Sequence, residues 1–512
     1  MRVNAGTVLG FYSAAIMFDP AFLTGETWGF GGAPVEHVET HAAHVFLVAD
    51  RAFKIKKDVS LPYLDFSTVE KRRAVLEEEL AINRSFAPDI YIDVIEVRGE
   101  PVLRMRRFPA QALLSRQMAQ GRIDGQLARR LARMIAEAHA AAPRRETRGV
   151  DIMMGLGAQL SNAFTSSADL FQPAETLEFH ALYEEALKRM RPLLNDRSAR
   201  GLVRRCHGDM HTGNIIVEDG EPKLFDAIEF SEKIATVDVL YDLAFLLMDL
   251  WWHGEHAAAN AVLNHYLHLR RSEEDLSGLA LLPLFLSTRA GVRALVTADL
   301  VHELPVSGSL RQRGMALDCF RASIAFLKPR PPILICVGGL SGTGKSTLAA
   351  ALAPMVGAAP GALHIRSDIE RKVLAGVDEF QRLPADSYSR QASFAVYETC
   401  IARAAKALAA GHSVVLDAVF SRDSERQHAA AVARQHKTGF LGLWLEAPAE
   451  SLTARVAARG ADASDATPGV VAQQRTYDLG RLDWERIDAS GSPAETLSRV
   501  RQRLPYRHAA PA

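Results

Sequence analysis

The stretch Gly339-Leu-Ser-Gly-Thr-Gly-Lys-Ser346 decides the fold of the C-terminal part of the chain. It follows an apolar run, Ile333 to Val337, that is typical of a buried parallel strand, and it matches the pattern G-x-x-x-x-G-K-[ST] at every fixed position. Glycines let such a loop turn its backbone N–H groups toward phosphates, and the N-terminus of the following helix attracts anions. The stretch therefore predicts a phosphate-binding loop between a strand and a helix.

The residues of this loop have distinct expected contacts. The Lys345 ammonium would reach the β- and γ-phosphates of a nucleotide, and the Ser346 hydroxyl would hold Mg²⁺. The remaining contacts are expected mostly from backbone N–H groups. The predicted nucleotide-binding residues of this part of the chain are Gly339, Ser341, Gly342, Thr343, Gly344, Lys345, Ser346 and Thr347.

Polar residues also follow the next strands of the predicted sheet. Asp368 comes after the strand predicted over 362–366, at the edge where ligands bind in such sheets, and its carboxylate can accept the proton of an attacking hydroxyl. Asp417 ends another apolar strand and is a candidate for organising Mg²⁺ and its water. Arg455 and Arg459 are four residues apart and share a helix face, where arginines suit a mobile lid over the transferring phosphoryl group.

The order of the predicted elements divides the chain into two domains. Strands and helices alternate through 333–512, after a Pro-rich linker at 329–333, which predicts a doubly wound parallel α/β sheet. The preceding domain, 31–328, begins with strands around one helix and continues as a mostly helical region. Such a two-lobed order is typical of a protein-kinase-like α+β fold. We interpret residues 1–30 as a poorly defined leader.

A second motif, Cys206-His-Gly-Asp-Met-His-Thr-Gly-Asn214, interrupts the helical region. Its Asp209 and Asn214 have the spacing of a kinase catalytic loop. Asp209 would accept the proton of the acceptor hydroxyl, and Asn214 would supply a neutral oxygen ligand to Mg²⁺. A strand, a turn and a second strand then lead to Asp226, which is a further predicted Mg²⁺ ligand at the end of that hairpin.

The strand-rich part of the first domain supplies a predicted phosphate contact. Ala52-Phe-Lys54 matches the A-x-K of the kinase strand motif, so Lys54 would bind the α- and β-phosphates and pair with Glu79 on the following helix. Lys56 and Glu78 remain alternatives for the two positions. A G-x-G-x-x-G loop does not precede Lys54, and the corresponding turn lies near residues 41–44. Residues 103–108 form the hinge expected to receive adenine.

These motifs resemble known families. The H-G-D-x-x-x-x-N loop resembles that of the aminoglycoside phosphotransferase and choline kinase family, and almost the whole chain resembles bacterial proteins that fuse such a domain to a P-loop ATPase. The C-terminal motifs resemble those of gluconate kinase, polynucleotide kinase and zeta toxins. The resemblance implies ATP and Mg²⁺ as cofactors, Asp368 as general base, and Arg455 or Arg459 as the lid arginine.

Composition limits the classes of partner and compartment. The chain has 512 residues with 60 basic and 60 acidic side chains, and its zero net charge argues against attraction of the whole protein to nucleic acid or membranes. We expect no membrane span, because the apolar runs fall short of roughly 18–20 residues. Four separated cysteines without a C-x-x-C pair argue against a disulfide framework or zinc site and favour the cytoplasm.

The expected function is ATP-dependent phosphoryl transfer at two kinase-type sites, each acting on hydroxyl groups of small molecules. Two alternatives stay open. In the first, one domain binds nucleotide without turnover and regulates the other, a role that the missing glycine-rich loop favours for the N-terminal domain. In the second, the P-loop domain phosphorylates polynucleotides or nucleotide sugars, which its basic residues permit. Those basic residues are Arg366, Arg371, Lys372 and Arg382.

Overall fold

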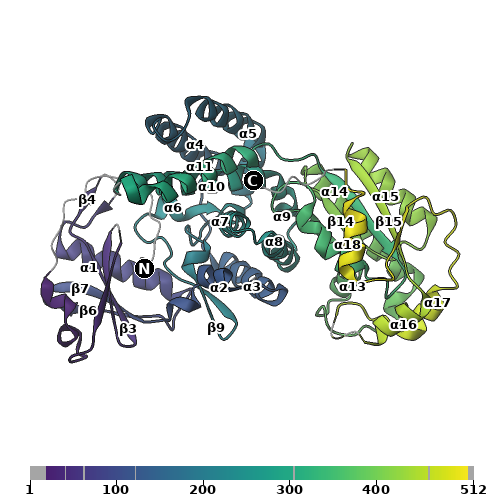
Figure 1. Ribbon diagram of the computed structural model, residues 1–512, viewed down its shortest axis with the longest axis horizontal. Helices are drawn as coiled ribbons and strands as arrows, with labels where there is room; N and C mark the ends of the chain where they lie inside the picture. The colour runs from purple at the N-terminus through teal and green to yellow at the C-terminus, as the bar shows by residue number, and fades with distance from the viewer. Residues whose placement is uncertain are drawn as a thin grey trace. The chain divides into compact units, whose positions relative to one another are not determined.

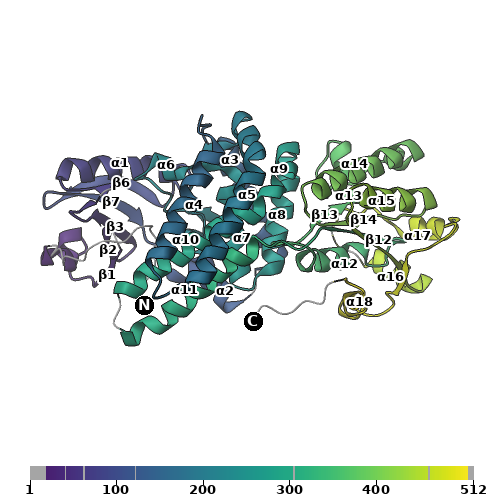
Figure 2. The same cartoon turned by 90° about the horizontal axis from the view of Figure 1, so that it is seen from above.

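The computed structural model describes residues 19–505, apart from positions 41, 62, 63, 122, 304, 305, 459 and 461. Its internal contacts divide the chain into two compact units (Figure 1 and Figure 2). The first unit consists of Met1–Ala258 and Leu284–Leu327, and the second consists of Ala259–Pro283 and Lys328–Ala512. The predicted boundaries place residues 259–283 in the N-terminal domain, whereas the contacts group them with the second unit. We call residues 259–283 the inserted segment.

A five-stranded antiparallel sheet forms the small lobe of the first unit, in the order β1-β2-β3-β7-β6. The helix predicted among the strands of this region is present, and the Thr68 side chain caps α1 by accepting a hydrogen bond from the Lys71 amide. The strand β1 was not predicted. The elements are β1 (Val35–Glu39), β2 (Ala43–Val48), β3 (Arg51–Lys56), β4 (Ser60–Leu61), β5 (Leu64–Asp65), α1 (Val69–Arg84), β6 (Tyr91–Val97) and β7 (Glu100–Arg106).

An aromatic cluster fills one side of this sheet. Trp28 stacks on Phe53 with ring centroids 4.4 Å apart, and its indole N–H donates to the Phe22 carbonyl. Phe22 and Trp28 lie on two short 3₁₀ helices, Pro20–Leu23 and Gly25–Trp28, and both side chains are buried. Residues 19–30 of the predicted leader thus contribute to the core, while the rest of that leader lies outside the described residues.

Helices form most of the remainder of the first unit, as predicted. The helix α4 was not predicted, because glycines interrupt its sequence. One of them, Gly157, lies so close to Tyr183 on α5 that a Cβ atom there would come within 2.2 Å of the ring. The helices are α2 (Leu114–Gln120), α3 (Gly125–Ala141), α4 (Gly149–Ser166), α5 (Pro173–Ala199), α6 (Glu232–Ala235), α7 (Val239–Trp252), α10 (Leu282–Glu303) and α11 (Val306–Phe326).

Two short strand pairs lie within this helical lobe and position its polar loops. The hairpin of β9 (Ile215–Glu218) and β10 (Glu221–Leu224) follows the predicted catalytic loop directly. The strands β8 (Val203–Arg205) and β11 (Thr236–Asp238) pair antiparallel and lead into that loop and into α7. The first unit is therefore a kinase-like fold with a strand-rich lobe and a helical lobe, which confirms the predicted class.

A five-stranded, all-parallel sheet forms the centre of the second unit, in the order β13-β14-β12-β15-β16. Helices cover both of its faces, with α14 and α15 on one side and α12 and α18 on the other (Figure 2). This confirms the predicted α/β class. The strands are β12 (Ile333–Gly339), β13 (Leu363–Arg366), β14 (Val414–Asp417), β15 (Gly439–Glu446) and β16 (Glu485–Asp488).

The helices of the second unit include two from the inserted segment. These are most of α8 (His256–Arg270) and all of α9 (Glu273–Gly278). The others are α12 (Lys345–Leu352), α13 (Ser367–Leu374), α14 (Arg390–Ala409), α15 (Asp423–Gln435), α16 (Ala449–Ala457), α17 (Pro468–Gln474) and α18 (Pro493–Arg501).

Within the described ranges, residues 273–301 are long and apolar enough to cross a membrane, but 72% of their most apolar window is buried, as in a core helix of a soluble protein.

Candidate active sites

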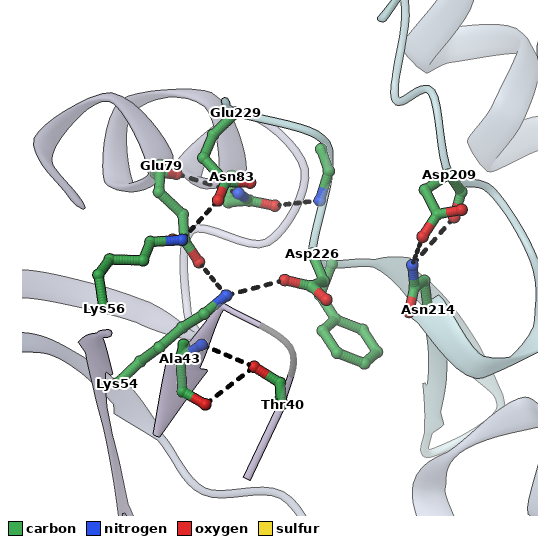
Figure 3. Close-up of polar contacts among 12 residues, drawn as sticks. Thr40, Ala43, Lys54, Lys56, Glu79, Asn83, Asp209, Asn214, Asp226 and Glu229 are labelled. Carbon is green, nitrogen blue, oxygen red and sulfur yellow. Dashed lines mark hydrogen bonds and ion pairs between the residues drawn. The ribbon is translucent and has the colours of Figure 1, made fainter. Parts of the chain in front are cut away.

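Lys54 of the first unit lies between two carboxylates. Its ammonium is 2.6 Å from Glu79 on α1 and 3.1 Å from Asp226 after β10 (Figure 3). Burial opposes the charge of Lys54, but Asp226 and Glu79 together hold its pKa well above the ordinary value. Of the alternatives left open by the sequence, the structure thus joins Lys54 to Glu79, and both remain the predicted nucleotide-binding residues.

A second lysine extends this ion pair into a chain of alternating charges. The Lys56 ammonium lies 2.7 Å from Glu79 and 2.5 Å from Glu229, and the three side chains are almost completely buried. Burial raises the pKa of Glu229 despite Lys56, whereas Lys54 and Lys56 hold the pKa of Glu79 below its ordinary value against the effect of burial. The sequence did not predict the Glu229 contact, which joins residues 173 positions apart.

Asp226 adopts a backbone conformation that needs support. Its φ is +59°, in the left-handed region that residues other than glycine seldom adopt. The Asp226 N–H donates to the Tyr91 hydroxyl, and the next N–H, that of Ala227, donates to the Asn83 side chain. These two hydrogen bonds fix the turn that aims the Asp226 carboxylate at Lys54. Burial opposes ionisation of Asp226, but Lys54 holds its pKa below the ordinary value.

Asp209 and Asn214, the two residues of the predicted catalytic loop, contact each other. The Asn214 side-chain N–H₂ donates to the Asp209 carboxylate at 2.9 Å and to the Asp209 carbonyl at 3.0 Å. Because the Asn214 side-chain nitrogen makes these two hydrogen bonds, the amide oxygen is the atom of Asn214 that could coordinate a metal ion. Burial opposes ionisation of Asp209, and His211 holds its pKa below the ordinary value. Figure 3 shows Asp226 between Lys54 and the Asp209–Asn214 pair, so the predicted metal ligands face one region.

Two buried aspartates on α7 position the catalytic loop through hydrogen bonds to its residues. The Asp242 carboxylate accepts hydrogen bonds from the backbone N–H of Gly208, at 2.9 Å, and from that of His207. The Asp249 carboxylate accepts from both the N–H and the hydroxyl of Thr212. Sequence reasoning did not identify these supports, because their partners lie more than thirty positions away.

A cavity of about 900 Å³ adjoins Lys54 and Asp226. Its volume falls within the range of small-molecule and cofactor sites, roughly 300–1,000 Å³. Part of the predicted hinge lines it, and the turn before β2 is closed by hydrogen bonds between Thr40 and Ala43. The lining includes Ala52, Lys54, Tyr91, Met105, Phe108 and Asp226.

The phosphate-binding loop of the second unit has the expected form. Gly339, Gly342 and Gly344 have φ values of 140°, 87° and 88°. A Cβ atom on Gly342 would lie 2.6 Å from the Leu452 carbonyl, so the loop fits against α16 only without a side chain there. Lys345 begins α12 and donates to the Leu340 carbonyl at 3.0 Å, within the loop that it is predicted to serve.

Asp368 and Asp417 follow neighbouring strands, at the same edge of the sheet. Asp417 pairs in register with Val337 on β12 and with Arg366 on β13. Arg366 lies 3.8 Å from Asp417 and 2.8 Å from Asp462. Burial and the neighbouring Asp417 raise the pKa of Asp368, whereas the nearby His364 and the charge of Arg366 hold the pKa of Asp417 down against burial. The pKa values of the two carboxyl groups are thus shifted in opposite directions, upward for Asp368 and downward for Asp417.

Of the two predicted lid arginines, the structure describes only Arg455. Arg455 donates to the backbone carbonyls of Ala489, Ser490 and Gly491, which follow β16. Its guanidinium therefore stabilises that turn in this structure, and its role over the phosphates stays a prediction. Arg459 lies outside the described residues.

A further polar cluster surrounds Lys372 on α13. The Asp465 carboxylate accepts from the Lys372 ammonium and the Tyr388 hydroxyl, both at 2.6 Å. The Arg371 guanidinium lies 4.8 Å from the Tyr388 ring centre and donates to the Ser387 carbonyl. Sequence reasoning noted the basic residues here but not Asp465 and Tyr388, which carry no motif.

Comparison with known families identifies two successive domains in the chain. Residues 73–282 match the phosphotransferase enzyme family, and residues 334–477 match an AAA domain family of P-loop proteins. The chain therefore contains a phosphotransferase-family domain and a P-loop domain, as the resemblance of the motifs implied.

Full-length relatives share both domains. The chain is 30% identical over 477 residues to the uncharacterized proteins Rv2004c of Mycobacterium tuberculosis and Mb2027c of Mycobacterium bovis, covering 88% of this chain and 92% of each relative. The chain belongs to the same two-domain family as these mycobacterial proteins.

Solved structures match each part separately. A choline/ethanolamine kinase family protein from Mesorhizobium loti covers 58% of this chain and 92% of its own, at 16% identity and a TM-score of 0.36. A sugar kinase from Janibacter sp. covers 34% of this chain and 94% of its own, at 18% identity and a TM-score of 0.27.

Proposed function

We propose that this protein is an ATP- and Mg²⁺-dependent phosphotransferase with two kinase-type sites, each transferring a phosphoryl group to a hydroxyl of a small molecule. The observation that carries the proposal is that Asp226 lies between Lys54 and the Asp209–Asn214 pair, while Lys54 and Asp226 line one cavity (Figure 3). Each side chain has the chemistry that phosphoryl transfer requires at its position. The phosphotransferase-family match over 73–282 supports the same conclusion.

In the first site, the donor set fits Mg·ATP. The Asp226 carboxylate and the Asn214 amide are the oxygen groups that Mg²⁺ prefers, and in this structure the Lys54 ammonium supplies the positive charge beside Asp226. Bound Mg²⁺ would neutralise charge on the phosphates during transfer. Lys54 would hold the α- and β-phosphates, and Asp209 would accept the proton of the attacking hydroxyl. The depressed pKa of Asp209 keeps this base ionised at neutral pH.

In the second site, the loop from Gly339 to Ser346 would hold the nucleotide phosphates through its N–H groups, with Lys345 at the β- and γ-phosphates. Ser346 and Asp417 would hold the metal and its water. Asp368 would act as general base. Its pKa is raised, and therefore lies closer to neutral pH than the pKa of an ordinary aspartate. The AAA domain match over 334–477 supports nucleotide binding here.

We propose small molecules rather than nucleic acid as acceptors, because the net charge of the chain is zero. We also propose the cytoplasm as its location. The four cysteines are buried free thiols, which suits a reducing compartment.

The test is ATP turnover by the full-length chain with a panel of hydroxyl-bearing metabolites. Asp209→Asn should abolish transfer at the first site and leave transfer at the second, whereas Lys345→Ala should do the reverse. The double variant should be inactive. Nucleotide binding at a site without product from any acceptor would favour the regulatory alternative for that domain. Phosphorylation of oligonucleotides at the Lys345-dependent site would replace the small-molecule proposal there.

A further inference from the structure

The inserted segment covers the open edge of the parallel sheet in the second unit. Among the described residues, β13 is an edge strand that pairs only with β14, so one side of its backbone lacks a strand partner there. On that side, the Asn264 amide of α8 accepts a hydrogen bond from the His364 N–H at 2.7 Å and donates to the Ala362 carbonyl at 3.2 Å. Asn260 donates to the same carbonyl at 3.0 Å.

The Asn264 side chain therefore substitutes for a neighbouring strand. Ala362 and His364 are two residues apart, which is the spacing at which one strand edge offers a carbonyl and an N–H to its neighbour. A side-chain amide can satisfy both groups, because it has one acceptor oxygen and two donor hydrogens. These contacts fix the position of β13 at the point where the chain leads toward Arg366 and Asp368.

A partly buried ion pair fixes the next turn of the chain. The Arg271 guanidinium, between α8 and α9, contacts both carboxylate oxygens of Glu370, at 3.0 and 2.8 Å. Arg403 on α14 lies 3.3 Å from the same carboxylate. Glu370 is only 4% exposed, and it lies on α13, two residues after Asp368. Both contacts come from one guanidinium nitrogen, Nη1, and hydrogen bonds between charged groups are stronger than those between neutral groups.

We propose that Asn264 and Arg271 of the inserted segment are positioning residues for Asp368 in the P-loop site. The proposal rests on the proposed role of Asp368 as general base. Asn264 sets the strand before Asp368, and Arg271 sets the helix turn after it. The phosphate-binding loop is built from β12 and α12, which these two residues do not contact through any hydrogen bond or ion pair recorded among the described residues.

Because Asn264 and Arg271 do not contact the phosphate-binding loop, a positioning role predicts a specific kinetic pattern. Loss of either residue should impair transfer to the acceptor hydroxyl while nucleotide binding is retained, because a general base must lie within hydrogen-bond reach of its proton. A purely structural contribution would lower nucleotide binding, thermal stability and turnover together.

The experiment uses the full-length chain carrying Asp209→Asn, so that the remaining turnover belongs to the second site. We expect Arg271→Met to lower kcat at least tenfold with KM for ATP within twofold, and Arg271→Lys to recover activity to within about threefold. Asn264→Ala should lower kcat in the same way and accelerate hydrogen exchange of the His364 amide. The matched control is Lys406→Met, which removes an exposed ion pair with Glu273 of the same segment and should change kcat by less than twofold.

The outcomes separate this inference from the proposed function. If Lys345→Ala leaves the remaining turnover unchanged, the P-loop site is not a kinase and both proposals fail. If Lys345→Ala abolishes turnover but Arg271→Met and Asn264→Ala do not lower kcat, only the positioning inference fails. It also fails if both variants raise KM for ATP as much as they lower kcat, or if the His364 amide exchanges at its original rate in Asn264→Ala.

Discussion

Replacement of Lys56 by methionine tests the buried charge chain of the first unit. Lys56, Glu79 and Glu229 have side chains that are 3%, 0% and 7% exposed, so water cannot compensate a missing charge. In Lys56→Met, Glu79 keeps its 2.6 Å contact with Lys54, but Glu229 loses the cation that lay 2.5 Å away. Removing one partner of a buried pair typically costs about 3–5 kcal/mol.

Protonation of Glu229 limits this cost and gives it a pH dependence. Starting from an ordinary pKa of 4.5, protonating the carboxyl at pH 7 costs about 3.4 kcal/mol at 1.36 kcal/mol per pH unit, and about 1.4 kcal/mol at pH 5.5. Because the folded variant then holds a proton that the unfolded chain releases above pH 4.5, its stability falls as pH rises. The deficit relative to the unmodified protein should therefore be about 3 kcal/mol at pH 7 and roughly half of that at pH 5.5.

Hydrogen exchange of the α1 amides is the suitable assay, because the chain has two units and global unfolding is not one transition. Rates corrected for intrinsic exchange give the local opening free energy between pH 5.5 and 8. In Lys56→Met/Glu229→Gln the deficit should be smaller and independent of pH. Lys57→Met, which removes an ion pair to the exposed Glu39, should cost less than about 1 kcal/mol. A deficit in Lys56→Met that does not vary with pH would refute the reasoning.

Three further predictions concern the sites. Asp242→Asn replaces one of the two oxygens that accept from the Gly208 and His207 amides by an N–H₂ group, and kcat of the first site should fall at least tenfold with ATP affinity within twofold in steady-state assays. Gly342→Ala places a Cβ atom 2.6 Å from the Leu452 carbonyl at a φ of +87°, and isothermal titration should show at least tenfold weaker ATP binding to the second site. Because the pKa of Asp368 is raised by burial and its base form is required, second-site activity should fall with decreasing pH through an apparent pKa above 3.8.

Motifs with short spacing were predictable from the sequence. Asp209 and Asn214 are five residues apart, and the eight residues from Gly339 to Ser346 form one turn, so local geometry determines their arrangement. The alternation of strands and helices likewise predicted the parallel sheet, because hydrophobic periodicity reflects which faces are buried.

The supports of the sites were not predictable, because they depend on tertiary contacts. The Ala227 N–H meets Asn83 across 144 positions, and the Asp226 N–H meets Tyr91 across 135. Neither Asn83 nor Tyr91 has a local pattern that distinguishes it from an ordinary helix or strand residue. Arg271 presents the same difficulty, since its partner Glu370 lies beyond the linker, 99 positions away.

The inserted segment has a consequence for how the chain is made. Residues 259–283 leave the ribosome before the linker and the whole P-loop sheet, although they belong to the same compact unit. At roughly 5–20 residues per second, synthesis of the remaining chain takes on the order of 10–50 s. During that interval α8 is present without the strand edge that its Asn260 and Asn264 contact, and residues 284–327 complete the first unit. The two units are thus interleaved in time as well as in sequence, so a gene cut at the linker would divide one of them.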